Sequence, residues 1–420
     1  MDWGGVTIMA AGLAAYSLVS GRLRSTPLTA PIAFVLIGLA MGPAGLGVAE
    51  FDADHAAVEL IAEFTLVLVL FSDAARIDVR QLARDHVLPI RMLSVGMPLT
   101  ILAGAGAALV VFPEFGIFEA GLLAAILAPT DAALGQAVVS DEAVPVRVRQ
   151  ALNVESGLND GIALPVVLIL ASLGSVMAAH AEEARGLVEW GAFIALQLGL
   201  GPLVGGVAGT FGGRLIDRCT ANGWLDESYE GVAALAVAII SYTGAVQVGG
   251  NGFIAAFVAG LCLGASVRHK CEFLYGFMEN EGRLLTLLTF TIFGAAMLPE
   301  ALENVSTAAV LYAALALTLL RIIPVVISLI GVRIGVATNL FLGWFGPRGL
   351  ASILFALLIL EEADIPNGEK ILTITVLTVA LSTLLHGATA APLARAYGML
   401  FKDQKPCEEL KPTSEAPVRT

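Results

Sequence analysis

The most constraining feature of the sequence is a series of long apolar segments separated by short polar ones. About 20 apolar residues cross a bilayer as a helix, and thirteen segments of the 420-residue chain approach this length. Composition agrees, because 57% of the residues are hydrophobic and 14% are charged, against about 25% charged in soluble domains. The sequence predicts an all-α polytopic membrane protein with no nucleic-acid partner. Its predicted spans lie near residues 4–20, 28–48, 57–73, 88–112, 116–139, 150–178, 187–210, 229–248, 252–267, 284–299, 304–331, 338–360 and 370–397.

The basic residues test this count independently, because cytoplasmic loops of membrane proteins collect Lys and Arg. Nineteen of the 23 basic residues follow odd-numbered spans, whereas only Arg185 and Lys370 follow even-numbered spans, and Arg321 and Arg348 lie inside spans. This alternation predicts thirteen helices with the N-terminus outside and the C-terminus in the cytoplasm. We expect one transmembrane domain over residues 1–398 and a short cytoplasmic tail over residues 399–420. The four cysteines lack metal-ligand spacing, and no cofactor is expected.

Ionisable residues inside apolar spans are candidates for function, because charge at bilayer depth is costly. The sixth span contains Glu155, Ser156, Asn159 and Asp160. Asp160 lies 13 residues after Arg147, which is roughly 20 Å along a helix and places it near mid-membrane. The spacing of three and four residues puts Ser156, Asn159 and Asp160 on one helix face.

The fifth and twelfth spans both carry a proline beside a charged residue. Pro129 precedes Thr130 and Asp131 in the fifth span, and Pro347 precedes Arg348 in the twelfth. Proline interrupts a helix and frees carbonyl groups, which serve as cation ligands in the broken helices of transporters. Asp131 lies 13 residues into its span, at the predicted depth of Asp160.

Matching interruptions are typical of transporters built from two inverted repeats. If residues 4–178 and 229–397 form two six-helix repeats joined by a linking helix at 187–210, the interrupted spans 5 and 12 occupy equivalent positions. We therefore expect these two spans to cross at mid-membrane, with Asp131 on one and Arg348 on the other.

Five motifs resemble those of NhaP-type sodium/proton antiporters of the monovalent cation:proton antiporter-1 family: APTD (128–131), ESGLNDG (155–161), GGNGFIAAFVAG (249–260), WFGPRG (344–349) and LLHGATAAPLA (384–394). The resemblance covers nearly all of spans 2–13. It implies a transporter rather than an enzyme, which exchanges Na⁺ (Li⁺ and K⁺ being alternatives) for H⁺ by alternating access. It also implies a homodimer in the plasma membrane of a bacterium or archaeon.

The resemblance assigns roles to particular residues. The cation and proton site maps to Thr130, Asp131, Ser156, Asn159 and Asp160, with Na⁺ at Asp160, Asp131, Ser156 and Thr130. The same resemblance pairs Glu155 with Arg348 in a structural ion pair, and gives supporting roles to Arg321, Pro129 and Pro347. Asp73 stands where relatives usually have a glutamate. An Asn-Asp sequence at 159–160 is found in relatives that exchange one cation for one proton without net charge.

The residue types suit this chemistry. Sodium prefers oxygen ligands, and the cluster offers carboxylate, hydroxyl, amide and main-chain oxygens. Burial raises the pKa of a carboxylate, so a buried acid can hold a proton near physiological pH until a cation displaces it. Asp160 is the expected carrier of each ion in turn, and Asn159 adds no second titratable charge.

A structural role stays open for every polar residue of this set. Asp131 and Asp160 could make structural hydrogen bonds, Thr130 and Ser156 could bond back to their own helices, and Asn159 could pack between helices. Asp73, near the cytoplasmic end of its span, fits an entrance or a solvated helix end as well as a ligand. His386 is interpreted as a packed or snorkelled histidine.

Other functions remain as alternatives. An intramembrane protease would need HExxH, GxSG or GxGD, and none occurs. A sodium-coupled carrier of organic anions would favour basic groups around a roomy cavity, whereas this cluster is acidic. A cation channel would conduct sodium without proton coupling.

Overall fold

The computed structural model describes residues 3–23, 26, 28–48, 56–77, 87–139, 141–178, 187–267, 272–362 and 365–401. Within these residues most of the chain is helical and no strand occurs. The predicted all-α fold is therefore confirmed. The predicted tail, residues 399–420, lies outside the described residues from 402 onward, as do Cys271 and Cys407.

The described helices coincide with the thirteen predicted spans, singly or in consecutive pieces. Up to residue 178 they are α1 (Trp3–Leu23), α2 (Ala30–Met41), α3 (Ala56–Ala75), α5 (Val87–Arg91), the π-helical turn η1 (Met92–Gly96), α6 (Met97–Val111), α7 (Ile117–Ile126), α8 (Ala132–Val139) and α9 (Val146–Ala178). They continue with α10 (Leu187–Ala221), α11 (Glu227–Gln247), α12 (Gly252–Ser266), α13 (Glu272–Ile292), the π-helical turn η2 (Phe293–Met297), α14 (Leu298–Glu303), α15 (Thr307–Leu317), α16 (Leu319–Ser328), α17 (Val336–Trp344), α18 (Leu350–Glu362) and α19 (Gly368–Met399).

Length and composition support membrane insertion. Among the described residues, seven helical segments are long and apolar enough to cross a membrane, and α2, α7 and α12 are shorter apolar helices. Several boundaries differ from the prediction. The tenth span was expected to begin at 284, but α13 begins at Glu272, and α10 runs to Ala221 rather than to 210. Helices continue beyond the apolar region that hydropathy detects, because the backbone hydrogen bonds within a helix do not depend on apolar side chains.

The eleventh span contains a break that the sequence analysis did not expect. Thr318 separates α15 from α16 with φ of −117° and ψ of −96°. Its hydroxyl donates to the carbonyl of Ala314 at 2.6 Å, a back-bonding contact that bends helices. Pro324 lies two turns further on, and it cannot donate to the carbonyl four residues before it.

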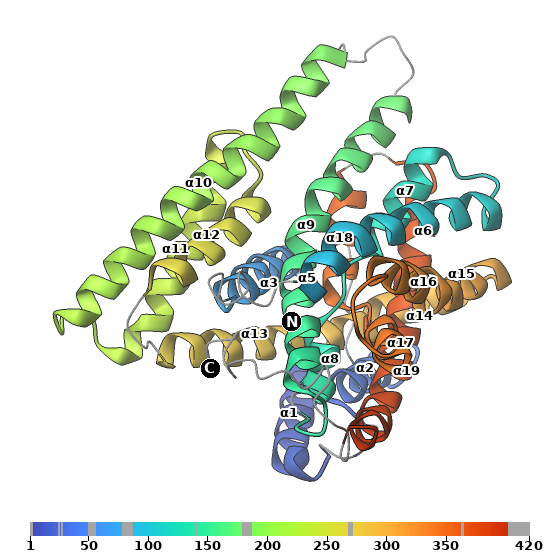
Figure 1. The fold of residues 1–420 in the computed structure, drawn as a ribbon, viewed down its shortest axis with the longest axis horizontal. Coiled ribbons are helices and arrows are strands. Elements are labelled where there is room, and N and C mark those ends of the chain that lie inside the picture. The colour runs from blue at the N-terminus through green and yellow to red at the C-terminus, as the bar shows by residue number, and fades with distance from the viewer. Residues whose placement is uncertain are drawn as a thin grey trace.

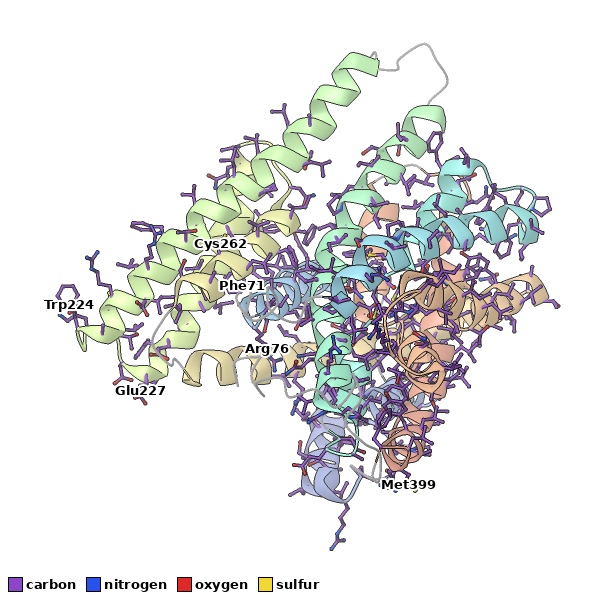
Figure 2. The ribbon with its side chains drawn as sticks, viewed as in Figure 1. Phe71, Arg76, Trp224, Glu227, Cys262 and Met399 are labelled. Carbon is purple, nitrogen blue, oxygen red and sulfur yellow. The ribbon has the colours of Figure 1, made fainter. Side chains whose placement is uncertain are left out.

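The helices gather into two groups. Helices α10, α11 and α12 pack side by side and share an apolar cluster with α3, as Figure 1 shows on its left. Phe71 lies where α3 meets this group, and Trp224 and Glu227 mark the distant connection from α10 to α11 (Figure 2). The second group contains α6, α7, α9, α15, α18 and α19, whose apolar side chains form a larger cluster with α2, α3 and α13. Helices α16 and α17 form a separate apolar cluster with α5, α8, α9 and α19.

Helices α10 and α12 approach each other too closely for a side chain at Gly205 and at Gly209. A Cβ atom on Gly205 would lie 2.2 Å from the carbonyl oxygen of Ala255, whereas a Cβ on the adjacent Gly206 would meet nothing within 4 Å. Small residues allow membrane helices to pack at this distance. The contact fixes the first group as a unit.

The two interrupted spans meet at their breaks, as predicted. The chain leaves helical geometry at residues 127–131, between α7 and α8, and at residues 345–349, between α17 and α18. The Asp131 amide donates to the carbonyl of Pro347 at 2.8 Å. The crossing of the fifth and twelfth spans is therefore confirmed, while the limits of the two proposed repeats stay a prediction.

A buried ion pair connects α9 to α16. Arg321 Nη2 lies 2.5 Å from Glu155 Oε1 and 2.7 Å from Oε2, and both side chains are 2% exposed. The predicted pair of Glu155 with Arg348 is therefore wrong. The charge of Glu155 still acts on Arg348, but the Arg348 guanidinium donates to carbonyl groups of the first break, and Arg321, in the first turn of α16, reaches the carboxylate instead.

We predict that Gly205→Ala lowers the thermal stability of the purified protein in detergent, because α10 must move away from α12 at a cost of about 1–3 kcal/mol. Gly206→Ala is the matched control, and we expect its melting temperature to stay at or slightly above that of the unmodified protein. Equal melting temperatures for the two variants would contradict the close contact.

A double-mutant cycle tests the ion pair. We expect Arg321→Met to destabilise the protein by about 3–5 kcal/mol, because it leaves Glu155 as an unpaired buried charge. Adding Glu155→Met should recover most of the loss. The measurement is thermal denaturation, and a second cycle that combines Glu155→Met with Arg348→Met is the comparison. A larger coupling free energy between Glu155 and Arg348 than between Glu155 and Arg321 would show that the Glu155–Arg321 pairing is wrong.

Candidate functional site

The first break and α9 bring four of the predicted site residues together. Ser156 Oγ donates to the main-chain oxygen of Thr130 at 2.7 Å, and Asn159 Nδ2 donates to Thr130 Oγ1 at 2.6 Å. Asp160 follows on α9, and all four residues are buried. Ser156 and Asn159, which the spacing places on one face of α9, thus both contact Thr130.

Two oxygen atoms of this cluster have no hydrogen-bond partner among the described residues. They are Oδ1 of Asn159 and Oδ1 of Asp160, and both are buried. Because Asn159 Nδ2 donates to Thr130, the amide oxygen is left free to accept. Buried polar atoms are normally paired, so two adjacent unpaired oxygens indicate a place where a ligand completes the site.

Asp131 joins the two interrupted spans. Its Oδ1 accepts from the amide of Leu134 at 3.1 Å, in the first turn of α8, and its Oδ2 accepts from the amide of Leu350 at 2.9 Å, where α18 begins. One carboxylate thus caps two helix N-termini, where unpaired amides and the helix dipole favour negative charge. Gly349 is required beside it, because a Cβ there would lie 1.8 Å from Asp131 Oδ2.

This capping changes the expected role of Asp131. Its carboxylate was predicted to bind sodium, but both oxygens already accept an amide hydrogen. A carboxylate has about four lone-pair sites, so it can still contribute to a cation. Its charge also acts on Asp160, together with that of Asp73. Direct ligation by Asp131 stays a prediction.

Arg348 donates to two carbonyl groups of the first break. Its Nη1 donates to the main-chain oxygens of Ala128 and of Pro129, the latter at 3.1 Å. These carbonyls were expected to be available to a cation. The structure instead shows them bound to a guanidinium, while Ser156 occupies the carbonyl of Thr130. The oxygens free to accept therefore lie mainly on α9.

Asp73 approaches the site from the last turn of α3 and is partly exposed. Its main-chain oxygen lies 3.6 Å from the position of a Cβ on Gly157, so the end of α3 packs against α9 beside Ser156. This position fits an entrance as well as a ligand, and ligation by Asp73 stays a prediction.

Two residues of α19 hold the second break, and their contacts were not predicted from the sequence. Ser382 Oγ accepts from the Arg348 amide at 2.7 Å, and His386 Nε2 lies 3.0 Å from the carbonyl oxygen of Trp344. His386 is buried, as expected of a packed histidine. The available signal was the four-residue spacing of Ser382 and His386, which places two polar groups on one face of an apolar helix.

No cluster of three His, Cys, Asp or Glu side chains suited to a metal ion occurs in the described part of the chain. The site offers one carboxylate with an unpaired oxygen, one amide oxygen and two hydroxyl groups. Such a set of oxygens suits a hard cation.

The family described as "Sodium/hydrogen exchanger, transmembrane" matches residues 8–396. The K(+)/H(+) antiporter NhaP of Alkalimonas amylolytica is 26% identical over 396 residues, covering 93% of this chain and 66% of the relative. The Na(+)/H(+) antiporter NhaP of Pseudomonas aeruginosa is 27% identical over 356 residues, covering 80% of this chain and 81% of the relative. This chain thus spans about two thirds of the length of the first of these relatives.

The solved structure of the sodium proton antiporter MjNhaP1 from Methanocaldococcus jannaschii shares the fold. The two chains superpose with a TM-score of 0.76 at 19% identity, over 92% of this chain and 98% of the other. At this identity the likeness establishes the architecture alone. The match to the family, in contrast, extends over most of the sequence and includes both breaks and α9. The chain therefore belongs to the sodium/hydrogen exchanger family.

Proposed function

We propose that this protein is a secondary active transporter that exchanges a monovalent cation for a proton, with Asp160 binding each in turn. The observation that carries the proposal is the pair of buried, unpaired oxygens on Asp160 and Asn159. Membership of the sodium/hydrogen exchanger family supports it. Sodium is the expected cargo, with Li⁺ and K⁺ as alternatives, since the relatives are named for both Na⁺ and K⁺ exchange.

The arrangement of donors suggests how the cation is held. Asp160 supplies negative charge, and Asn159 supplies an amide oxygen beside it. The hydroxyl oxygens of Thr130 and Ser156 each keep a lone pair after the hydrogen bonds already described. We therefore add Asn159 Oδ1 to the expected ligands Asp160, Asp131, Thr130 and Ser156.

Exchange follows from the competition for one carboxylate. A cation beside Asp160 stabilises its charged form, and a proton neutralises it, so the two bind alternately. A charged and empty carboxylate in an apolar bundle is costly, so the unloaded site does not readily change sides. Asn159 stands where a second carboxylate would add a titratable charge, and this favours one cation for one proton without net charge movement.

The buried arginines argue against a carrier of organic anions. Arg321 is paired with Glu155, and Arg348 donates to main-chain carbonyls of the first break. Each guanidinium group is therefore already engaged through an Nη atom, although its Nε has no partner among the described residues, so an anion would compete with these contacts. A cation channel would conduct the cation without moving protons, whereas an exchanger couples the two movements. The proton measurements below therefore distinguish the two functions.

We also expect a homodimer in the plasma membrane of a bacterium or archaeon, with the N-terminus outside and the C-terminus in the cytoplasm. The distribution of Lys and Arg between the two sides supports the orientation. The bacterial relatives support the source.

We predict that Asp160→Asn abolishes cation-driven proton movement, because an amide can neither ionise nor release a proton. The measurement is dissipation of a pH gradient in proteoliposomes after addition of Na⁺, Li⁺ or K⁺. Glu142→Gln, at an exposed acid between α8 and α9, is the control and should keep the activity of the unmodified protein. Retained exchange in Asp160→Asn would remove the basis of the proposal.

We predict that exchange by the unmodified protein is insensitive to membrane potential, whereas Asn159→Asp makes it sensitive. Moving one net charge across 100 mV corresponds to about 2.3 kcal/mol, so an electrogenic cycle should show a clear response. Initial rates at imposed potentials of both signs provide the measurement. A strong response of the unmodified protein would contradict one-for-one exchange.

A further inference from the structure

Helix α19 holds both ends of the second break. The break begins after Trp344, the last residue of α17, and ends before Leu350, the first residue of α18. His386 Nε2 lies 3.0 Å from the carbonyl oxygen of Trp344, and Ser382 Oγ lies 2.7 Å from the amide nitrogen of Arg348. Both α19 side chains are 1% exposed or less, so the protein supplies the partners of their polar atoms.

The hydrogen-bond partners define what the imidazole does. A carbonyl oxygen only accepts, so Nε2 of His386 carries the hydrogen and donates to Trp344. Ser382 Oγ accepts from the Arg348 amide, and its own hydrogen can point to Nδ1 of His386 at 3.1 Å. The main-chain oxygen of Ser382 lies at the same distance from Nδ1. When Nδ1 accepts from Ser382 Oγ, a ring with its hydrogen on Nε2 links the two ends of the break through a continuous chain of hydrogen bonds.

Trp344 is anchored to α19 through its side chain as well. Its indole nitrogen donates to Thr389 Oγ1 at 3.1 Å, and its ring lies 5.0 Å from the His386 ring. Thr389 follows His386 by three residues, on the same face of α19. Thr389 bonds only to the side chain of Trp344, whereas His386 bonds to its main-chain carbonyl. A variant of Thr389 is therefore a matched control for a variant of His386.

The second break is coupled to the cation site by Arg348. The Arg348 amide is fixed by Ser382, and the Arg348 guanidinium donates to the carbonyls of Ala128 and Pro129. The next residue is Thr130, which accepts hydrogen bonds from Ser156 and Asn159. A displacement of the second break therefore shifts the residues that surround Asp160.

We infer that His386 is a positioning residue for cation binding, which sets the geometry at Thr130 by holding the Trp344 carbonyl and, through Ser382, the Arg348 amide. The inference rests on the proposed exchange function. It gives a role in transport to a histidine that does not touch the cation.

Three single variants separate positioning from simple packing. His386→Gln keeps a side-chain N–H near the place of Nε2, His386→Leu fills the space without a donor, and Thr389→Val removes only the contact to the Trp344 indole. We expect His386→Leu to raise the half-saturating cation concentration about threefold or more, since one hydrogen bond corresponds to roughly this factor. His386→Gln should stay close to the unmodified protein, and Thr389→Val should leave this concentration unchanged.

The readouts are the cation dependence of exchange in proteoliposomes, the amount of folded protein and its melting temperature. A purely structural role would lower the maximal rate or the yield of His386→Leu without changing the half-saturating concentration. That result would overturn the inference, and so would a His386→Gln variant as impaired as His386→Leu.

Hydrogen–deuterium exchange of the full-length protein keeps the test independent of transport. We expect the amides of residues 346 and 348–350, which include that of Arg348, to exchange about tenfold faster in His386→Leu than in His386→Gln, because a backbone that has lost an anchoring hydrogen bond opens more often. Unchanged protection would overturn the inference even if transport is normal. If the unmodified protein does not exchange cations for protons, the proposed function is refuted. If His386→Leu changes amide protection but not the half-saturating cation concentration, His386 has a structural role only, and its role in cation binding is rejected.

Discussion

The structure depends on two interrupted helices that supply each other's hydrogen-bond partners where they cross. An apolar bundle supplies no water, so each amide and carbonyl that a break exposes needs a partner from the protein. Asp131, in the first break, accepts from the amides at the starts of both α8 and α18. Arg348, in the second break, donates to the carbonyls of Ala128 and Pro129 in the first. Each break thus supplies the charge that the other requires, and the close contact at Gly349 leaves no space for a side chain between them.

This frame explains why the unpaired groups lie on α9. Arg321 fixes α9 through Glu155, and Ser156 and Asn159 fix it to Thr130. With these contacts made, the carbonyls of the first break have donors, whereas Oδ1 of Asn159 and Oδ1 of Asp160 have none in the described part of the chain. Two unpaired oxygens beside these hydrogen-bonded segments suit the proposed cation site. The carboxylates of Asp73 and Asp131 also act electrostatically on Asp160.

Much of this arrangement was predictable from the sequence, since apolar length defines the spans, proline defines the breaks, and helical spacing places Ser156, Asn159 and Asp160 together. The pairing of charges was not predictable, because spacing along the chain does not say which of two buried arginines reaches Glu155. The break at Thr318, which brings Arg321 to α9, has a weak signal, since threonine is common in membrane helices. The capping role of Asp131 and the contacts of Ser382 and His386 join segments more than 30 residues apart, so they emerge only from the tertiary structure.

The central claim is that one buried carboxylate carries either a cation or a proton. The most direct test is calorimetric titration of the purified protein with Na⁺ in buffers of different ionisation enthalpy, at a pH where the unloaded site is protonated. The dependence of the observed heat on the buffer gives the number of protons released for each cation bound. The account predicts the release of about one proton per cation. Cation binding with no proton release would contradict it.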